Sequence, residues 1–356
     1  MTDNFEVVVD GQRATARSGE TVLEVSERLG IEIPTLCHDT RLDPTGACRM
    51  CLVEVSTQRR LQPACKFLVT DGMEIQTGTE RVGRHRQNLL SLYLSDHPLD
   101  ADGLPVERAV GNDLREHVGS YGTGPKLEPI HADRESRDDP NPYIHFSPES
   151  CINCARCVRY CDEVEAVSAI TLAGRGASTT IATASQIGLL DSTCELCGGC
   201  IDTCPTGAMS EMKSLGMLAL AEEKVRTTCN FCGVGCQMDL HVKDGEVVRV
   251  SSPPPGETLN DGNLCVKGRF SFEFIHHEER LTQPLVRGAD GVLHPASWEE
   301  ALQATAEGLL GIKKRHGADA LGFVSSSRCT GEENYLVQKL SRAAFGTNNC
   351  HQCAAT

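Results

Sequence analysis

The sequence lacks any long apolar run. No stretch approaches the roughly 18 apolar residues that a membrane-spanning helix requires, so we expect no membrane span. The N-terminal MTDNFEVVVDGQ has neither the basic start nor the apolar centre of a secretory signal. We therefore expect a cytoplasmic protein, and in a reducing cytosol grouped thiols bind metals more often than they form disulfides.

Basic and aromatic residues are also scarce. The chain has 34 Lys and Arg against 49 Asp and Glu, a net charge of −15, and only 4% aromatic residues. This acidic balance argues against a nucleic-acid-binding surface. Few aromatic residues and 33 glycines suit small, loop-rich modules that bound inorganic centres stabilise as much as apolar cores do.

Cysteine, by contrast, is abundant, and its 19 residues fall into tight groups. CINCARCVRYC from residue 151 and CELCGGCIDTC from residue 194 share the spacing C-x2-C-x2-C-x3-C, and Pro205 follows the second run. This doubled spacing is typical of bacterial two-cluster ferredoxins, in which the fourth Cys of each run binds the other cluster. Residues 141–212 therefore predict one [4Fe-4S] cluster on Cys151, Cys154, Cys157 and Cys204, and another on Cys194, Cys197, Cys200 and Cys161. Tetrahedral zinc is the alternative.

Residues 1–78 predict a small α+β module. FEVVVDGQRATAR reads as a β-hairpin with Asp10-Gly11 at its turn, and Thr21 with Glu24 forms the capping box of a helix ending at Gly30. Four thiolates on loops of a β-grasp sheet would suit a [2Fe-2S] centre, although their C-x10-C-x2-C-x13-C spacing differs from the plant-type pattern. These candidate ligands are Cys37, Cys48, Cys51 and Cys65. Buried or zinc-binding cysteines are the alternative.

Residues 79–140 predict a helix over 79–96 and, from residue 111, a polar linker without a core of its own. The preceding cysteine module resembles the one that begins the large iron–sulfur subunit of respiratory complex I, some hydrogenases and NAD-linked formate dehydrogenases. In those families HPLD, here starting at His97, opens an H-x3-C-x2-C-x5-C site for a further [4Fe-4S] cluster. The three Cys positions are here occupied by Ala101, Leu104 and Val110. We therefore expect a degenerate module in which His97 is structural.

A third cysteine group lies in residues 222–284, after a helix that we expect over 213–227. Its spacing, C-x2-C-x3-C-x28-C, encloses a hairpin with Asp244-Gly245 at the turn, and its members are Cys229, Cys232, Cys236 and Cys265. This group resembles the [4Fe-4S] domain of the molybdenum or tungsten bis-pterin oxidoreductases. The resemblance places Lys267 between cluster and pterin; a solvated surface lysine is the alternative.

Residues 285–356 predict the incomplete start of an α/β domain. Ser297 and Glu300 cap a helix that ends at Gly317, a strand follows over 320–326, and a second helix spans about 332–345. Helix, strand and helix make one unit of a parallel sheet, but we find no partner strand for it. We therefore expect the chain to stop inside a domain.

The module order, with SSSRCTGEENYLVQKLSRAAFGTNN and NNCHQCAAT, resembles the catalytic α subunit of cytosolic NAD- or ferredoxin-linked formate dehydrogenases. The resemblance implies formate/CO2 chemistry at a Mo- or W-bis(pyranopterin guanine dinucleotide), contacted by Arg328, Thr330 and Asn334. It puts the metal-binding Cys or selenocysteine directly after Thr356, so this chain alone should be inactive. We expect a selenocysteine codon there; a split gene or truncation is the alternative.

The predicted whole is a multidomain α+β chain that holds one [2Fe-2S] and three [4Fe-4S] clusters. Its expected partner is a flavin- and NAD-binding diaphorase-type subunit or a ferredoxin-linked subunit, and no nucleic acid. Two other functions remain open. One is a non-catalytic electron-transfer subunit like that of complex I, and the other is another bis-pterin enzyme such as nitrate reductase.

Overall fold

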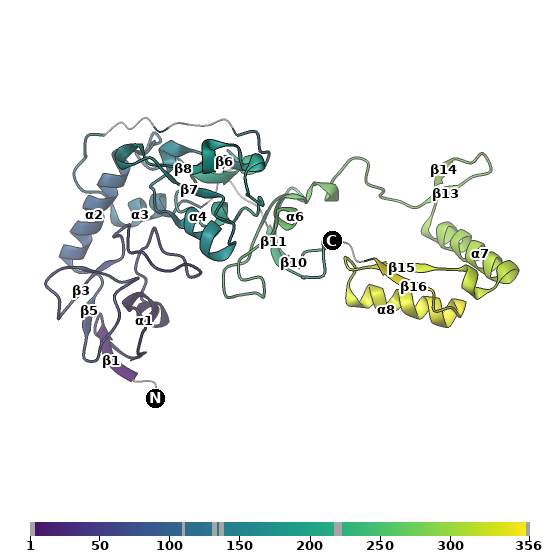
Figure 1. The fold of residues 1–356 in the computed structure, drawn as a ribbon, viewed down its shortest axis with the longest axis horizontal. Coiled ribbons are helices and arrows are strands. Elements are labelled where there is room, and N and C mark those ends of the chain that lie inside the picture. Colours follow the sequence, from purple (N-terminus) through teal and green to yellow (C-terminus); the bar gives the residue numbers. More distant parts are fainter. Residues whose placement is uncertain (1–3, 109–110, 130–133, 135–138, 217–222, 354–356) are drawn as a thin grey trace.

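The structure is a computed structural model, and it describes residues 4–108, 111–129, 134, 139–216 and 223–353. Small sheets and short helices follow one another, and the fold is mixed α/β and multidomain, as predicted. Figure 1 shows the units up to α6 (Val266–Phe270) gathered together, whereas the segment from β13 (Leu285–Arg287) onward lies beyond an extended stretch. Within the described ranges, no helix is long and apolar enough to cross a membrane.

The first unit is a five-stranded sheet. β1 (Asn4–Val9) and β2 (Gln12–Arg17) form the predicted hairpin. Asp10 and Gly11 have φ of 48° and 83°, because a primed two-residue turn needs positive φ at both positions. The strand order is β2-β1-β5-β3-β4, with β5 parallel to β1 and the other pairs antiparallel. The other strands are β3 (Leu52–Val55), β4 (Gln62–Pro63) and β5 (Glu74–Gln76).

Helix α1 (Val22–Arg28) covers this sheet and gives the unit its core. The predicted capping box is present: Thr21 Oγ1 accepts from the Glu24 N–H at 3.3 Å, and the Glu24 carboxylate accepts from the Thr21 N–H at 2.7 Å. Leu23 of the helix packs with Val53 and Ile75 of the sheet in one buried cluster. Full burial of such a side chain contributes about 1.5–3 kcal/mol, so the unit has a core of its own.

Two helices join the first unit to the second. α2 (Glu80–Leu94) confirms the helix predicted over 79–96. α3 (Asp113–Tyr121) lies where we predicted a linker without a core, and that prediction is wrong. Leu114 and Val118 of α3 are buried in one cluster with Leu90 of α2. Two apolar residues four positions apart are too few to stand out as a helical period in a polar sequence.

The second unit is built of short elements around the two ferredoxin-type cysteine runs. β6 (Ile144–Phe146) pairs antiparallel with β9 (Met209–Glu211), which joins the two ends of the unit. A hairpin and two short helices lie between them. These are β7 (Ile170–Ala173), β8 (Thr180–Thr183), α4 (Arg156–Arg159), which continues as a π-helical turn over Tyr160–Val164, and α5 (Gly199–Asp202).

The third unit is a three-stranded antiparallel sheet followed by α6. Its strands are β10 (Glu223–Thr228), β11 (Gln237–Lys243) and β12 (Glu246–Ser251), and the last two confirm the predicted hairpin. The helix predicted over 213–227 is wrong for 223–227, which are strand; residues 217–222 lie outside the described residues. β10 pairs with β11 along its whole length, and this pairing overrides the helix propensity of its Glu and Lys.

The last unit holds a small hairpin and one parallel strand pair. β13 and β14 (Leu293–Pro295) form the hairpin, and α7 (Trp298–His316) begins with the predicted Ser297–Glu300 capping box. β15 (Phe323–Ser326) and α8 (Gly331–Lys339), continued as a π-helix over Leu340–Phe345, match the predicted strand and second helix. Our expectation of no partner strand is wrong, because β16 (Cys350–Cys353) runs parallel to β15. The polar CHQC sequence gives no strand signal of its own.

Candidate metal centres

The first cysteine group lies in the loops around β3 and β4, and all four side chains are buried. The thiols interact in two pairs, Cys37 with Cys48 and Cys51 with Cys65. A hydrogen bond from Cys48 lowers the pKa of Cys37 to about 5, whereas the same contact raises the pKa of Cys48. The pKa of Cys65 is likewise lowered and that of Cys51 raised. Two close sulfur pairs suit two irons, each with two thiolate ligands.

The structure sorts the eight cysteines of the second unit into two crossed sets. Cys204, from the second run, lines an apolar cavity with Cys151, Cys154 and Cys157 of the first run. Burial raises the pKa of the Cys154 thiol to about 12, and the nearby Cys204 and Cys151 contribute to the rise. Burial also raises the pKa values of Cys194 and Cys200, and electrostatic repulsion from the nearby Cys161 adds to both rises.

Backbone geometry repeats between the two runs. Non-helical, positive φ values occur at matching positions, 54° at Asn153 and 55° at Leu196. In this conformation the Asn153 N–H points at Cys151 Sγ and the Leu196 N–H at Cys194 Sγ, both at 3.4 Å. Hydrogen bonds to cluster sulfurs favour the negatively charged thiolate and are one means by which proteins set cluster potentials.

The third group is less enclosed than the others. Cys229 is buried, Cys232 and Cys236 are half-buried, and Cys265 is exposed at the start of α6. Burial raises the pKa of Cys236, with repulsion from the other three cysteines adding to the rise, so the four lie close together. Lys267, two residues after Cys265, is exposed on α6.

The three cysteine groups together provide four sets of four cysteines, and each set has the donors that an iron–sulfur cluster needs. Each offers four thiols without a disulfide between them, and burial raises the pKa of thiols such as Cys151 to about 11. A buried thiolate is costly without a cation, and cluster iron would supply that cation. Among the described residues, no three Cys, His, Asp or Glu side chains converge tightly enough for a single metal ion.

The first and second cysteine groups share one hydrophobic core. Cys37 and Cys48 are buried in the cluster of α2 and α3, and Ile152 and Cys154 pack against the same cluster. Tyr93 of α2 bridges the two groups: its hydroxyl donates to the Cys48 carbonyl at 3.3 Å. Burial raises the pKa of Tyr93, and Cys48, Cys37 and Cys154 add to that rise. The two groups are therefore neighbours across a single core.

The second and third groups are joined by α6. Arg269 is only 2% exposed, donates from Nε to the Cys197 carbonyl at 2.8 Å and forms a bidentate pair with Asp202. A Cβ on Gly198 would overlap the Arg269 side chain, and Gly198 has φ of 75°, so a glycine is needed there. The adjacent Phe270 stacks on Tyr143 of the second unit at 4.7 Å between ring centroids.

His97 lies between the first and second units and is buried. Its Nδ1 is 3.0 Å from the Pro98 carbonyl, while Nε2 has no hydrogen-bond partner within the described ranges. Burial lowers the pKa of His97. Leu104, at one of the positions that a cysteine would occupy, packs against the apolar cluster of α2 and α3. Val110 lies outside the described residues.

The predicted pterin contacts lie where β15 ends and α8 begins. Thr330 is the N-cap of α8 and accepts from the Glu333 N–H, Asn334 donates to the Thr330 carbonyl at 2.9 Å, and Arg328 is exposed. This is the carboxyl end of a parallel strand, the edge where α/β sheets bind ligands. The same loop approaches the third cysteine group, since a Cβ on Gly233 would lie 3.8 Å from the Ser327 carbonyl oxygen.

The sequence did not indicate several residues that connect the cysteine groups in the structure. Tyr93 lies in the helix predicted over 79–96 and Arg269 lies two residues after Lys267, but neither was singled out as a contacting residue. Asp39, Arg41 and Arg156, whose contacts are described below, carried no signal at all. Apart from the local Asp39–Arg41 pair, their hydrogen-bond partners are more than 40 residues away along the chain, so no local pattern marks them.

Comparison with protein families matches four stretches of the chain to known domains. Residues 2–80 match a 2Fe-2S iron–sulfur cluster binding domain, and residues 141–210 match the ferredoxin-like domain of NADH-quinone oxidoreductase subunit 3. Residues 222–277 match the Fe4S4 domain of molybdopterin oxidoreductases, and residues 280–356 match the molybdopterin oxidoreductase domain.

Curated relatives align over almost all of this chain. It is 38% identical to an NADPH-Fe(3+) oxidoreductase subunit alpha of Geobacter sulfurreducens, over 96% of this chain and 39% of the relative. It is 37% identical to an NADH-quinone oxidoreductase subunit of Rhizobium meliloti, over 97% and 40%. A Staphylococcus aureus protein with the provisional name formate dehydrogenase is 27% identical over 99% and 39%.

The chain thus spans about two fifths of the length of these relatives. A chain of an NAD+-reducing [NiFe]-hydrogenase superposes with a TM-score of 0.49 at 24% identity, over 60% of this chain and 89% of that one, which is too weak to bear on function. The family matches agree with the cysteine groups found in the structure. The chain therefore consists of ferredoxin-type iron–sulfur domains followed by molybdopterin oxidoreductase domains.

Proposed function

We propose that the chain is the iron–sulfur relay of a larger oxidoreductase, linking a partner subunit to a Mo- or W-bis-pterin centre. The partner would be of the flavin- and NAD-binding or ferredoxin-linked kind. The observation that carries this proposal is the unbroken series of contacts between cysteine groups. Tyr93 and Ile152 join the first to the second, and Arg269 joins the second to the third.

The thiolate groups would hold one [2Fe-2S] and three [4Fe-4S] clusters, which supply one-electron carriers when bound. The chain's own residues bury these sites, donate N–H groups to their sulfurs and fix their separation. The degenerate His97 site does not interrupt the series, because the first and second groups already share a core. Lys267 and the Arg328–Asn334 loop would face the pterin at the far end.

The cofactor content is tested by iron and sulfide analysis of the reconstituted 356-residue chain. The sixteen cysteines predict about fourteen irons, with EPR signals of one [2Fe-2S] and three [4Fe-4S] clusters after reduction. About eighteen irons would mean that His97 holds a further cluster. Zinc with little iron would contradict the proposal.

Formate oxidation, or CO2 reduction, is the finer proposal for the full-length protein. It is supported by the segment around Arg328 and Asn334 and by the relative that carries the provisional name formate dehydrogenase. The relatives at 37–38% identity, however, are named for NADPH or NADH. The test is formate-dependent dye reduction by the full-length, metal-loaded protein, with the 356-residue chain measured alongside.

A full-length protein that carries its clusters but shows no formate activity would contradict the formate proposal alone. The relay would then serve another bis-pterin reaction, such as nitrate reduction, or an electron-transfer subunit like that of complex I. NAD(P)H-dependent reduction of its clusters through a flavoprotein partner would still support the relay.

A further inference from the structure

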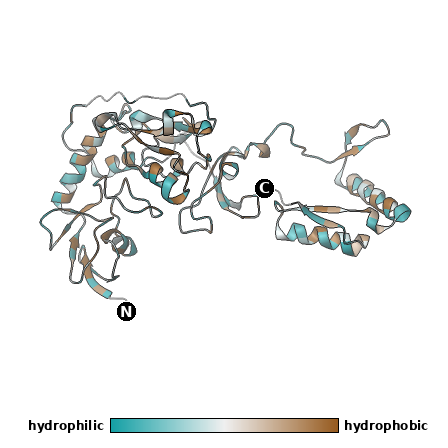
Figure 2. Ribbon diagram, viewed as in Figure 1, coloured by the Kyte–Doolittle hydropathy of each residue, from teal (hydrophilic) through white to brown (hydrophobic). Residues whose placement is uncertain are grey.

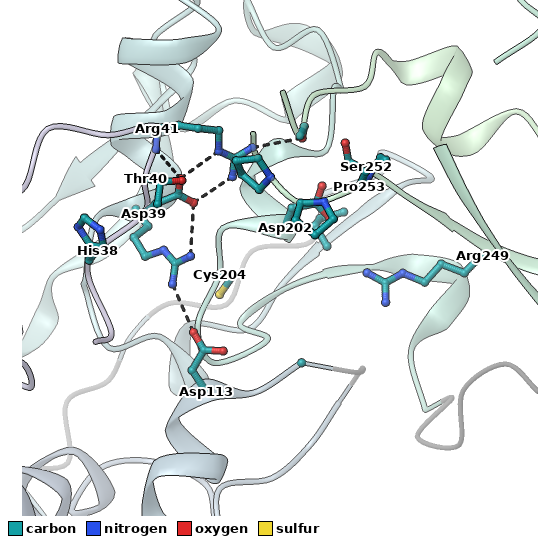
Figure 3. A pocket seen from close by; sticks show the side chains of 16 residues that line it. His38, Asp39, Thr40, Arg41, Asp113, Asp202, Cys204, Arg249, Ser252 and Pro253 are labelled. Carbon is teal, nitrogen blue, oxygen red and sulfur yellow. Dashed lines mark hydrogen bonds and ion pairs between the residues drawn. The ribbon is translucent and has the colours of Figure 1, made fainter. Parts of the chain in front are cut away.

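Three iron–sulfur units meet at a polar junction, which Figure 3 shows from close by. His38 to Arg41 come from the first unit, Arg156, Asp202 and Cys204 from the second, and Arg249 and the Pro253–Pro255 stretch from the third. Asp39 lies at the centre of the dashed contacts in the figure. The residues of this junction therefore connect all three units at one place.

Asp39 contacts arginines from two units at this junction. Its side chain is 5% exposed, and it accepts two parallel hydrogen bonds from Arg41, Nε to Oδ1 and Nη2 to Oδ2, both at 2.9 Å. Arg156 of the second unit donates from Nη2 to Oδ2 at 3.4 Å. Arg156 also reaches Asp113 of α3 at 3.4 Å. One carboxylate thus accepts hydrogen bonds from its own unit and from the next.

Arg41 extends the junction to the remaining unit. Its Nη1 donates to the Gly262 carbonyl of the third unit at 3.2 Å, and its guanidinium carbon lies 4.8 Å from the ring centroid of Tyr160. Tyr160 precedes Cys161, and Gly262 lies three residues before Cys265. The Arg41 side chain is only 7% exposed, so these contacts form in a largely dry environment.

Each partner of the central pair is next to a candidate ligand. Asp39 follows Cys37 by two residues, and Arg156 lies between Cys154 and Cys157. Arg159, one turn further, donates to the Cys37 carbonyl at 2.5 Å and to the Asp43 carbonyl at 2.6 Å. The ligand loop of the first unit is therefore bound to the ligand helix of the second at several points.

We propose that Asp39, through its pair with Arg156, is a positioning residue that fixes the distance between the first and second cysteine groups. This inference rests on the proposed relay. Electron transfer needs a fixed separation of carriers, and two domains joined only by apolar contacts could shift against each other. The buried pair favours one relative position of the two units, because a displaced Asp39 carboxylate would leave the buried Arg41 guanidinium without its carboxylate partner and Arg156 with Asp113 alone.

The test is spin-relaxation EPR on the full reconstituted chain. In the unmodified protein, the reduced [2Fe-2S] signal should relax faster because a reduced [4Fe-4S] cluster lies nearby. Asp39→Asn and Arg156→Gln should each lower this enhancement at least twofold with unchanged iron content, and Asp39→Glu should restore part of it. Glu54→Gln is the matched control, since it breaks the partly exposed Glu54–Arg81 pair between β3 and α2, away from the junction, and should change nothing.

Unchanged relaxation in Arg156→Gln would overturn the proposal. If Asp39→Asn fails to bind its cluster, Arg156→Gln alone tests the positioning role. The Arg41–Asp39 pair remains intact in Arg156→Gln, so the first unit should keep its cluster. A lack of any enhancement in the unmodified chain would instead contradict the relay itself. The two failures are therefore distinguishable.

Discussion

The iron–sulfur units and the C-terminal unit bury their side chains very differently. In the first three units most candidate ligands belong to hydrophobic clusters, and residues such as Leu23, Leu90 and Arg269 are at most 2% exposed. In the last unit, over its described length, α7 has no buried residue, and Trp298 and Leu302 are 71% and 63% exposed. Figure 2 shows apolar and polar residues alternating along α7 and α8.

This difference separates two kinds of site. The cysteines are held by cores of their own, so their geometry is largely set within the described residues. The predicted pterin contacts lie on a two-stranded sheet, and only their local capping and hydrogen bonds are fixed there. We therefore expect that removing metal or substituting core residues destabilises the iron–sulfur units strongly and the C-terminal unit weakly.

The largest effect should come from removing iron. Chelation under reducing conditions leaves groups of buried thiols without a cation, and metal binding is coupled to folding in small metal domains. Hydrogen exchange should rise throughout the second unit, whereas α7 should keep the protection that it has in the loaded chain. Equal loss of protection in both regions would contradict the comparison.

Loss of a single ligand should remove one cluster. Cys157→Ser should lower the iron content from about fourteen to about ten, because one [4Fe-4S] site would be lost. Cys329→Ser, at an exposed cysteine of the C-terminal unit, is the matched control and should leave iron content unchanged. Iron analysis with EPR measures both. Retention of all the irons by Cys157→Ser would exclude this residue as a ligand.

The next largest effect on stability should come from breaking a buried ion pair. Arg269→Met leaves Asp202 without its partner and removes a hydrogen bond to the Cys197 carbonyl. We expect a loss of about 3–5 kcal/mol in the stability of the second unit, measured by hydrogen exchange of the loaded chain. Asp290→Asn, in the exposed pair with His294, should cause no measurable change.

The smallest effects contrast two leucines. Leu90→Ala in α2 opens a cavity in the cluster that holds Cys37 and Cys48, and should cost about 2–5 kcal/mol. Leu302→Ala in α7 should change the stability of its own unit by no more than about 0.5 kcal/mol, since the side chain is exposed. Hydrogen exchange of α2 and α7 gives both values. A larger cost at Leu302 would show that this side chain is buried in solution.

Local signals in the sequence predicted much of the fold. The Asp10-Gly11 turn and the capping boxes at Thr21 and Ser297 all depend on residues within a few positions of one another. Cysteine spacing likewise predicted that Cys204 lies beside the cysteines of the first run, as the structure shows, and crossed ligation itself stays a prediction. These features could be read before any tertiary contact was known.

Long-range contacts could not be predicted in this way. α3 is held by two apolar residues in a polar segment, and β16, which has a polar sequence, pairs in parallel with β15. The Asp39–Arg156 pair joins residues 117 positions apart. In each case the stabilising partner comes from another element, so neither propensity nor periodicity in the segment itself carries the information.

The most direct test of the relay is freeze-quench EPR after substoichiometric reduction of the reconstituted chain. If the cysteine groups form one connected series, the electron should reach its final distribution over all clusters within milliseconds, whichever cluster is reduced first. In Cys157→Ser, exchange between the [2Fe-2S] cluster and the cluster of the Cys229 group should slow markedly. A [2Fe-2S] signal in the unmodified chain that persists for seconds, out of equilibrium with the other clusters, would contradict the account.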